Sequence, residues 1–328
     1  MLVVYYQRHP QQDQFSLERM FSDVRRSLPK TVKSKIYVAR FVSRGFFRRL
    51  FNIFEAIFHQ GDVNHITGDI HYLALLLKKK KTILTIPDLV NIHRLKGLRR
   101  KIFLLLWYRL PIRRVSIVTV ISESTKNELL RHVDVRPEKI QVVPCSLSSN
   151  FTYHPKYFNV DKPTILQIGT AENKNLRRSF QALIGLSCHL RIIGRISPEI
   201  ILLLNGGGVE YSNLIDLTDS QIIQEYIKCD IVLFASIYEG FGLPIIEAQA
   251  IGRAVITSSV ASMVEVAGIG ACMVDPLSID DIRRGVKRVI KDEKYRNTLI
   301  EAGFKNTSKF NADVIALKYL NLYKMLVG

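Results

Sequence analysis

The sequence predicts an α/β protein with two domains, each built around an open parallel sheet. The chain has 328 residues, about twice the usual length of a single domain. Short runs rich in Val, Ile and Leu alternate with helical patterns along most of it, as expected for parallel strands covered by helices. A polar segment with prolines, at about Ser148–Pro163, interrupts the alternation near the middle and is expected to link the domains.

The first domain is expected over residues 1–155, where short apolar runs have the length and composition of buried strands. These runs are Leu2–Tyr6, Ile36–Ala39, Val63–Ile66, Thr82–Ile86, Ile117–Ile121 and Ile140–Val143. Helices are expected between them.

The second domain is expected over residues 156–310, where the same pattern returns. Its expected strands are Thr164–Ile168, Leu190–Ile193, Ile231–Ala235, Ala254–Thr257 and Ala271–Val274. Residues 311–328 then alternate apolar and polar side chains at helical spacing. Their apolar side comprises Leu317, Leu320, Tyr323 and Leu326. We expect this segment to form a closing helix that packs back on the first domain.

The net charge of +18 is concentrated in the first half of the chain. Residues 1–150 carry 27 Lys and Arg against 11 Asp and Glu, a net charge of +16, whereas residues 151–328 carry 20 against 18. The composition, 47% apolar and 23% charged, is that of a globular and not a disordered protein. An excess this one-sided indicates an anionic partner surface, either nucleic acid or the cytoplasmic face of a membrane.

Two basic segments of the first half, residues 40–58 and 96–114, also carry large apolar side chains. The first has Arg40, Arg44 and Arg48 spaced four apart among phenylalanines, and the second encloses the run Ile-Phe-Leu-Leu-Leu-Trp-Tyr. This mixture favours a surface that lies on anionic lipid. A solvated basic face over an ordinary core is the alternative.

The sequence shows no sign of a membrane span or a leader peptide. The opening apolar run reaches Arg8 too early for the core of a signal peptide, and no apolar stretch approaches the roughly 18–20 residues that cross a bilayer. We therefore expect a cytoplasmic protein held peripherally on the inner face of the membrane. The cysteines are widely spaced without a C-x-x-C pair, which favours reduced buried thiols and predicts no disulfide or metal site.

The first segment that indicates chemistry begins at Ile165 and reads Ile-Leu-Gln-Ile-Gly-Thr-Ala-Glu-Asn-Lys-Asn-Leu. It has the pattern of a buried strand, a turn containing glycine and the start of a helix. Lys174 lies at that helix start, where unpaired backbone N–H groups and the helix dipole favour an anion such as a diphosphate. The alternative is an ordinary solvated lysine in a loop.

The second such segment, Glu-Gly-Phe-Gly-Leu-Pro from Glu239, follows another buried strand. Gly240 and Gly242 let the backbone approach a ligand, and the N–H groups of Gly242 and Leu243 are expected to face phosphate. Glu247 is expected in the first turn of the helix that follows. Two carboxylates then border one anion-binding crevice, where they can accept hydrogen bonds from ribose and sugar hydroxyls. Alternatively, Glu247 merely complements the helix dipole.

Glu239 and Glu247, with the sequence around them, resemble the E-x7-E motif of the family-4 glycosyltransferases. The resemblance covers about Thr164–Leu277 closely and extends weakly upstream through residues 120–129 and 139–144. It implies the GT-B fold, in which two Rossmann-like domains face a central cleft, and retention of the anomeric configuration. It also implies a nucleotide-sugar donor held by the C-terminal domain, with no metal ion and no other cofactor, because cationic side chains and a helix N-terminus stabilise the leaving diphosphate.

Carried onto matching positions, the resemblance gives each residue a role. Lys174 neutralises the diphosphate, Glu247 holds the ribose hydroxyls, Glu239 contacts the donor sugar, and the backbone around Ile215 and Asp216 meets the base. The donor-binding positions are Gly169, Thr170, Lys174, Ile215, Asp216, Gly240, Phe241, Gly242, Leu243 and Glu247.

The sequence departs from the family pattern in three places. Thr170 stands where many relatives have Arg, so a second positive charge must come from Arg177, Arg178 or Arg195. The common H-x-H reads His-Ile-Thr from His65, and His71 is the nearest substitute for its second histidine. A later T-x-H-D pattern reads Thr-Ile-Pro-Asp and ends at Asp88. His71 and Asp88 are therefore the candidates in the first domain for assisting catalysis.

The expected function is transfer of a sugar to a lipid-linked glycan acceptor in the synthesis of a cell-surface polysaccharide or glycolipid. Two alternatives come from other classes. Thr67 and Pro87, which replace expected histidines, suggest a catalytically inactive sugar-binding scaffold. The basic half suggests a nucleic-acid-binding protein, but no nucleic-acid-binding motif accompanies it and the glutamate motif is left unexplained.

Overall fold

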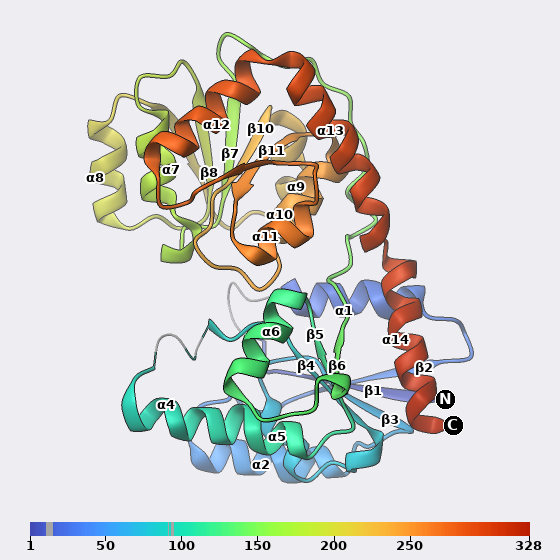
Figure 1. The fold of residues 1–328 in the computed structure, drawn as a ribbon. Coiled ribbons are helices and arrows are strands. Elements are labelled where there is room, and N and C mark those ends of the chain that lie inside the picture. Colours follow the sequence, from blue (N-terminus) through green and yellow to red (C-terminus); the bar gives the residue numbers. More distant parts are fainter. Residues whose placement is uncertain (11–15, 91, 93–94) are drawn as a thin grey trace. The chain divides into compact units, whose positions relative to one another are not determined.

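The structure, a computed structural model, describes residues 1–10, 16–90, 92 and 95–328. The chain divides into two compact units: unit 1 comprises Met1–Ser146 and Ala312–Gly328, and unit 2 comprises Leu147–Asn311. The described residues form one six-stranded parallel sheet in each unit, with helices around it (Figure 1). The α/β prediction is thereby confirmed. Residues 147–155, which were expected at the end of the first domain, group with unit 2.

Unit 1 has the strand order β2-β1-β3-β4-β5-β6. The strands are β1 (Leu2–Gln7), β2 (Lys33–Val38), β3 (Val63–Ile66), β4 (Thr82–Ile86), β5 (Ile117–Val120) and β6 (Ile140–Val142). The helices are α1 (Ser16–Ser27), α2 (Phe46–Ile57), α4 (Gly97–Phe103), α5 (Leu110–Arg113), α6 (Glu123–His132) and α14 (Ala312–Val327). Shorter turns are η1 (His71–Leu75), η2 (Lys79–Lys81), η4 (Pro137–Lys139) and the π-helical η3 (Leu104–Arg109), which joins α4 to α5.

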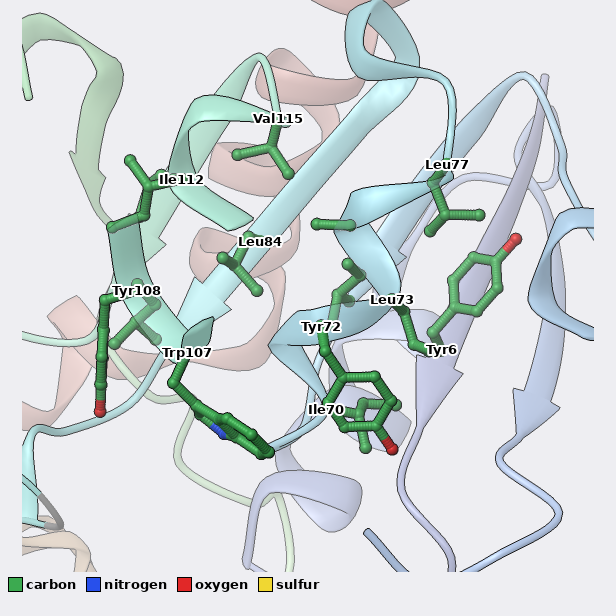
Figure 2. Packing of buried hydrophobic residues seen from close by; sticks show 14 of the residues in the cluster. Tyr6, Ile70, Tyr72, Leu73, Leu77, Leu84, Trp107, Tyr108, Ile112 and Val115 are labelled. Atoms are coloured by element: carbon green, nitrogen blue, oxygen red, sulfur yellow. The ribbon is translucent and has the colours of Figure 1, made fainter. Parts of the chain in front are cut away.

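The sheet of unit 1 is covered on both faces. β3 and β4 are buried at every position, and Figure 1 shows α2, α4 and α5 on one side of the sheet with α1 and α14 on the other. Parallel strands require this cover, and it favours apolar residues, although β3 also buries Asn64 and His65. On the α2 side, the core is rich in aromatic rings, and Figure 2 shows Tyr72, Trp107 and Tyr108 among its aliphatic side chains.

The closing helix α14 packs against α1 and β3 of unit 1. Its buried side chains are Ile315, Ala316, Tyr319, Leu320, Leu322 and Tyr323. The expected apolar side is therefore shifted, because Leu317 is exposed and Tyr319 is buried. Tyr319 is turned inward because its ring packs on Phe21 and His65, at centroid distances of 5.5 and 5.2 Å.

Unit 2 has the strand order β12-β11-β10-β7-β8-β9. The strands are β7 (Thr164–Ile168), β8 (His189–Ile193), β9 (Glu210–Leu214), β10 (Ile231–Phe234), β11 (Ala254–Ser258) and β12 (Cys272–Val274). The helices are α7 (Leu176–Leu183), α8 (Pro198–Gly206), α9 (Asp219–Lys228), α10 (Leu243–Ile251), α11 (Ala261–Ala267), α12 (Ile279–Lys291) and α13 (Glu293–Thr307), with the 3-10 turns η5 (Glu172–Lys174) and η6 (Ser308–Phe310).

Most strands lie within one or two residues of their expected positions, but β9 does not follow from the sequence pattern. Its sequence, Glu-Tyr-Ser-Asn-Leu, lies at the edge of the sheet and none of its residues is fully buried. The four cysteines are buried and unbonded, as their spacing indicated. Within the described part of the chain, no helix combines the length and the apolar character needed to cross a membrane.

His65 lies at the centre of a buried polar network in unit 1. Its Nδ1 is 2.8 Å from Tyr323 Oη and its Nε2 is 2.7 Å from Thr85 Oγ1. Tyr323 Oη donates in turn to Tyr5 Oη at 3.1 Å. Burial lowers the pKa of His65 to about 3, so the ring is neutral at pH 7. The network ties α14 to three strands, and it gives this histidine a place in the core.

We expect His65 to make the folded protein less stable in acid. The unfolded chain protonates this side chain near the ordinary pKa of 6.5, whereas the folded chain does so near 3. The free energy of unfolding therefore falls as the pH falls from 6.5 towards 3, by at most about 1.4 kcal/mol per pH unit from this group.

Urea unfolding at several pH values tests this expectation. His65→Gln should show a shallower dependence of the free energy of unfolding on pH than the parent. Tyr323→Phe is the control, because it weakens the same network but leaves the imidazole buried, so it should lower stability at every pH with the parental slope. Equal slopes for the parent and His65→Gln would contradict the prediction.

Candidate active site

The strand order of unit 2 creates a switch point between β7 and β10. The connection after β7 leads to β8 on one side, and the connection after β10 leads to β11 on the other. Open α/β sheets bind ligands outside the carboxyl ends of their strands at such a point. The two segments singled out from the sequence, residues 169–175 and 235–242, are the loops that follow these two strands.

Lys174 and Glu239, which come from separate motifs, form an ion pair at this point. Lys174 Nζ lies 2.6 Å from Glu239 Oε1 and 4.8 Å from the centroid of the Phe234 ring. Asn173 donates to the same carboxylate oxygen at 3.3 Å and to the Tyr238 carbonyl at 3.0 Å. Among the described residues, none donates to the second oxygen, Oε2. One oxygen of this mostly buried carboxylate is thus open to a further hydrogen-bond donor.

Gly169 gives the lysine room to reach the carboxylate. Its backbone is left-handed, with φ +84°, and a Cβ atom at this position would lie 3.0 Å from both Cγ and Cε of Lys174. Any other side chain would therefore both strain the backbone and displace the lysine stem. The glycine of this motif is required by the geometry of the ion pair.

The three candidates for a second positive charge, Arg177, Arg178 and Arg195, differ in their surroundings. Thr170 Oγ1 donates to the carbonyl of Arg195, and the Arg195 guanidinium pairs with Asp216, with Nη2 2.7 Å from Oδ2. Arg178 Nη1 donates to Asn175 Oδ1 at 3.2 Å, directly beside the lysine loop. Arg177 is exposed on α7. Of the three arginines, Arg178 therefore makes its contact nearest to Lys174, because Asn175 directly follows that lysine.

Glu247 lies deeper in its helix than the sequence pattern predicted. α10 begins at Leu243, after an N-cap at Gly242 with φ +107°, so Glu247 belongs to the second turn and not the first. The prediction of a first-turn position was wrong, because the helix begins at Leu243 and Glu247 is its fifth residue. Tyr226, which is buried, donates its hydroxyl to Glu247 Oε2. This bond fixes the carboxylate.

The remaining predicted positions lie on the loops around the switch point and on the end of β9. Ser262 Oγ donates to the Glu239 carbonyl at 2.8 Å and supports the loop that includes Gly240. Phe241 is buried against Phe310, with ring centroids 5.6 Å apart, so its side chain belongs to the core of unit 2. Ile215 and Asp216 follow β9, and Asp216 has a left-handed backbone with φ +54°.

Sequence reasoning missed Asn175, which the structure places in the centre of this region. Its backbone is left-handed, with φ 58° and ψ 30°. Its Nδ2 donates to the carbonyls of Ala235, at 2.9 Å, and Pro276, at 2.7 Å. The signal in the sequence is an Asn directly before a helix, a residue that tolerates positive φ and caps helices.

In unit 1, His71 and Asp88 follow the adjacent strands β3 and β4. His71 is buried, its Nδ1 is 2.9 Å from the carbonyl of Trp107, and burial lowers its pKa. A carbonyl only accepts, so Nδ1 carries the proton and the neutral ring presents a lone pair at Nε2. Nε2 is buried and has no hydrogen-bond partner among the described residues. Trp107 Nε1 donates to Asp69 at 2.6 Å and holds this arrangement.

Asp88 and the positions of the incomplete histidine motifs have local roles in unit 1. Asp88 Oδ1 accepts from the Val90 N–H at 3.0 Å, which shapes the turn after β4. Thr67 is buried and donates to the Tyr6 carbonyl at 3.1 Å. His65 belongs to the core network described above. Of the two described histidines His65 and His71, only His71 has a ring nitrogen without a partner in the described chain.

Comparisons with known proteins identify both halves of the chain. The family model described as Glycosyltransferase Family 4 matches residues 5–150, and the one described as Glycosyl transferases group 1 matches residues 151–306. The serotype-specific mannosyltransferase WbdA of Escherichia coli is 26% identical over 222 residues, which is 60% of this chain and 27% of that protein. The O-antigen chain mannosyltransferase B of Escherichia coli is 24% identical over 233 residues, covering 64% and 61% of the two chains.

A third relative is the N,N'-diacetylbacillosaminyl-diphospho-undecaprenol alpha-1,3-N-acetylgalactosaminyltransferase of Campylobacter jejuni, 24% identical over 67% of this chain and 63% of its own length. Among solved structures, sucrose-phosphate synthase from Thermosynechococcus elongatus matches with a TM-score of 0.81 and 15% identity over 99% of both chains. The Anabaena protein Alr3699/HepE, in complex with UDP and glucose, has the same TM-score and coverage at 12% identity. The two family models together span nearly the whole chain, which therefore belongs to the family-4 glycosyltransferases and has their GT-B fold.

Proposed function

We propose that this protein is an active retaining glycosyltransferase that moves a sugar from a nucleoside-diphosphate donor to a lipid-linked glycan acceptor. The observation that carries the proposal is the Lys174–Glu239 pair at the switch point of unit 2, with Glu247 fixed on the helix that follows. The product would be a cell-surface polysaccharide or glycolipid. The names of the relatives support these substrate classes, since two are mannosyltransferases and one names a diphospho-undecaprenol.

The chain spans 27% of the length of the mannosyltransferase WbdA, so the roles of the donor-side residues rest on this chain's own geometry. Lys174 has three N–H donors, of which Glu239 takes one, and the others bind the diphosphate. Glu239 Oε2 accepts a hydrogen bond from a hydroxyl of the donor sugar. Glu247, which Tyr226 orients, accepts hydrogen bonds from the ribose hydroxyls. The backbone at residues 215–216 contacts the base.

The same groups support departure of the nucleoside diphosphate. Negative charge grows on the diphosphate as the sugar leaves, and both the Lys174 ammonium and the N-terminus of α10 at Gly242 are placed to stabilise it. We propose that these groups act without a metal ion. The departing phosphate takes the proton of the acceptor hydroxyl on the same face of the sugar, so the anomeric configuration is retained and no protein nucleophile is needed.

His71 of unit 1 is proposed to accept a hydrogen bond from a substrate hydroxyl. Its Nδ1–H is held by the Trp107 carbonyl, and its Nε2 lone pair has no partner in the described chain. A buried acceptor without a donor costs about 1–3 kcal/mol, and a sugar hydroxyl can supply the missing donor. Because burial lowers the pKa of His71, the lone pair stays available below the usual pH range for histidine.

We also place the protein at the inner face of the membrane. A lipid-linked acceptor presents its glycan there, and the +16 charge of residues 1–150 is complementary to the anionic lipids of the cytoplasmic leaflet.

The first test is turnover of nucleotide sugars. A thermal-shift panel of nucleoside diphosphates and their sugars identifies the donor, since a ligand of the folded state raises the unfolding temperature. With that donor we expect slow hydrolysis without acceptor, no loss of rate on adding a chelator, and a first-formed product that keeps the donor's anomeric configuration in NMR spectra. Binding without any turnover would favour an inactive scaffold, and an inverted product would overturn the retaining mechanism.

The second test separates the donor-side residues. Lys174→Ala should weaken nucleoside-diphosphate binding by roughly 10- to 150-fold, because a charge-assisted hydrogen bond contributes about 1.5–3 kcal/mol. Glu247→Ala should also weaken it, whereas Glu239→Gln should lower kcat with little change in nucleotide affinity. Calorimetry and steady-state kinetics measure both quantities, with Lys305→Ala, an exposed lysine on α13, as the control. If the three site variants changed affinity and kcat alike, the assigned roles would be wrong.

The third test concerns His71. His71→Phe keeps the buried ring but removes the Nε2 acceptor, so kcat should fall by about 10- to 100-fold while nucleoside-diphosphate affinity stays within about twofold. His65→Gln is the matched control: it perturbs a buried histidine of β3, the strand that His71 follows, and should reduce stability but not the kcat of the folded protein. Parental kcat in His71→Phe would remove His71 from the site.

A further inference from the structure

The outer side of α2 carries large apolar side chains in contact with solvent. Phe47, Phe51, Phe54 and Phe58 follow one another at intervals of four, three and four residues, so they form one stripe along the helix and its end. Their exposed fractions are 81, 43, 52 and 83%. The opposite side of α2 already packs on the core, where Ile53 is buried. A surface helix of a soluble protein has polar residues on its outer side, so this stripe requires another explanation.

A second apolar stripe lies on the neighbouring helix α4 and its continuation η3. Its exposed side chains are Leu98, Ile102, Leu105 and Leu106. The Arg49 guanidinium of α2 lies 4.5 Å from the centroid of the Trp107 ring in η3, so the two elements are in contact. Figure 1 shows α2 and α4 on the same side of the sheet. Both stripes therefore belong to one side of unit 1.

Exposed cations accompany both stripes. Arg44 and Arg48 flank the start of α2, and Lys96, Arg99 and Lys101 lie along α4. None of these five forms a salt bridge with the described residues. The one acidic residue of α2, Glu55, accepts from the Tyr37 hydroxyl at 2.8 Å. This side of unit 1 thus combines apolar and positively charged groups.

This combination decides between the possible occupants of the surface. A second copy of the chain would bring the same cations face to face, which is unfavourable. A nucleic acid would meet the cations, but the aliphatic stripe of α4 and η3 offers its bases no stacking partner. An anionic bilayer satisfies both groups, because headgroups meet the cations and the boundary with the acyl chains takes the apolar side chains.

We propose that this side of unit 1 docks on an anionic lipid bilayer, with the α2 phenylalanines inserted below the headgroups and the cations of α2 and α4 on them. The proposal rests on the proposed function only for the identity of the acceptor: a lipid-linked glycan is presented at such a surface. Attachment has two components. The cations attract the protein to the anionic bilayer, and salt shortens the range of this attraction. The inserted phenylalanines add an apolar contribution to binding that salt does not screen.

Cosedimentation with vesicles of phosphatidylcholine and about one third phosphatidylglycerol separates the two components. The parent should bind strongly in about 0.1 M salt and keep part of its binding in about 1 M salt, where the Debye length is only about 3 Å. The triple variant Phe47→Ser, Phe54→Ser, Phe58→Ser should lose the salt-resistant part, with a partition coefficient lower by more than about tenfold. The quadruple variant Arg44→Ser, Arg48→Ser, Arg99→Ser, Lys101→Ser should lose mainly the binding at low salt.

The matched control removes equally exposed apolar side chains elsewhere. The triple variant Leu202→Ser, Ile269→Ser, Met325→Ser changes residues that are 74, 86 and 71% exposed, and it should bind vesicles like the parent. A second readout uses an environment-sensitive dye on Phe47→Cys, since the native cysteines are buried. Its emission should shift to the blue on adding vesicles, whereas the dye on Leu202→Cys should not respond.

Several results would overturn the proposal. They are absence of vesicle binding by the parent, equal high-salt binding by the parent and the phenylalanine variant, an unshifted dye at position 47, and a parent dimer that the phenylalanine variant dissolves. Tight, salt-sensitive binding to oligonucleotides in place of vesicles would do the same. Vesicle binding needs no nucleotide sugar, so it can fail while turnover succeeds. Acceptor-independent hydrolysis by the phenylalanine variant should be parental, which keeps the two proposals separate.

Discussion

The side-chain amide of Asn175 fixes the loops that carry the residues proposed to bind the donor. It joins the loop after β7 to the carbonyls of Ala235 and Pro276, which follow β10 and β12. The residue is buried, so loss of the amide would leave two carbonyls without their donor, at a cost of about 1–3 kcal/mol each. Lys174 immediately precedes this residue. The position of the lysine is therefore set by the core of unit 2 and not by its own contacts with solvent.

The ion pair between Lys174 and Glu239 contributes more to the organisation of the site than to stability. Both side chains are mostly buried, and the cost of removing two charges from water offsets much of the attraction within such a pair. Stability therefore gives little reason to place a cation and an anion on two loops at a switch point. Pre-organisation gives a better reason. The ion pair and Asn173 orient one oxygen of the Glu239 carboxylate and leave the other available. Gly169, with φ +84°, leaves room for the lysine stem.

The parts of the fold that follow from sequence are those in which one physical requirement dominates. Parallel strands buried on both faces favour apolar residues, so β10 and β11 fall within one residue of where the runs of Val, Ile and Leu predict them. β9 is an edge strand without that requirement and was missed. The first turn of α10 was misplaced because it depends on the left-handed N-cap at Gly242, and a positive φ leaves only a glycine as its mark in the sequence. The loops after β7 and β10 were located from the sequence because their motif fixes residue types, whereas Asn175 acts through contacts with distant carbonyls.

His65 and His71 show most clearly why a sequence cannot rank two similar residues. Both lie between α2 and β4, both are buried, and burial lowers the pKa of each. Tyr323, which is distant in sequence, supplies a hydroxyl to one nitrogen of His65, and Thr85 binds the other. Among the described residues, His71 has a partner on one nitrogen only. The difference between a core residue and a candidate for binding substrate is thus a single hydrogen bond, and a helix at the other end of the chain decides which histidine receives it.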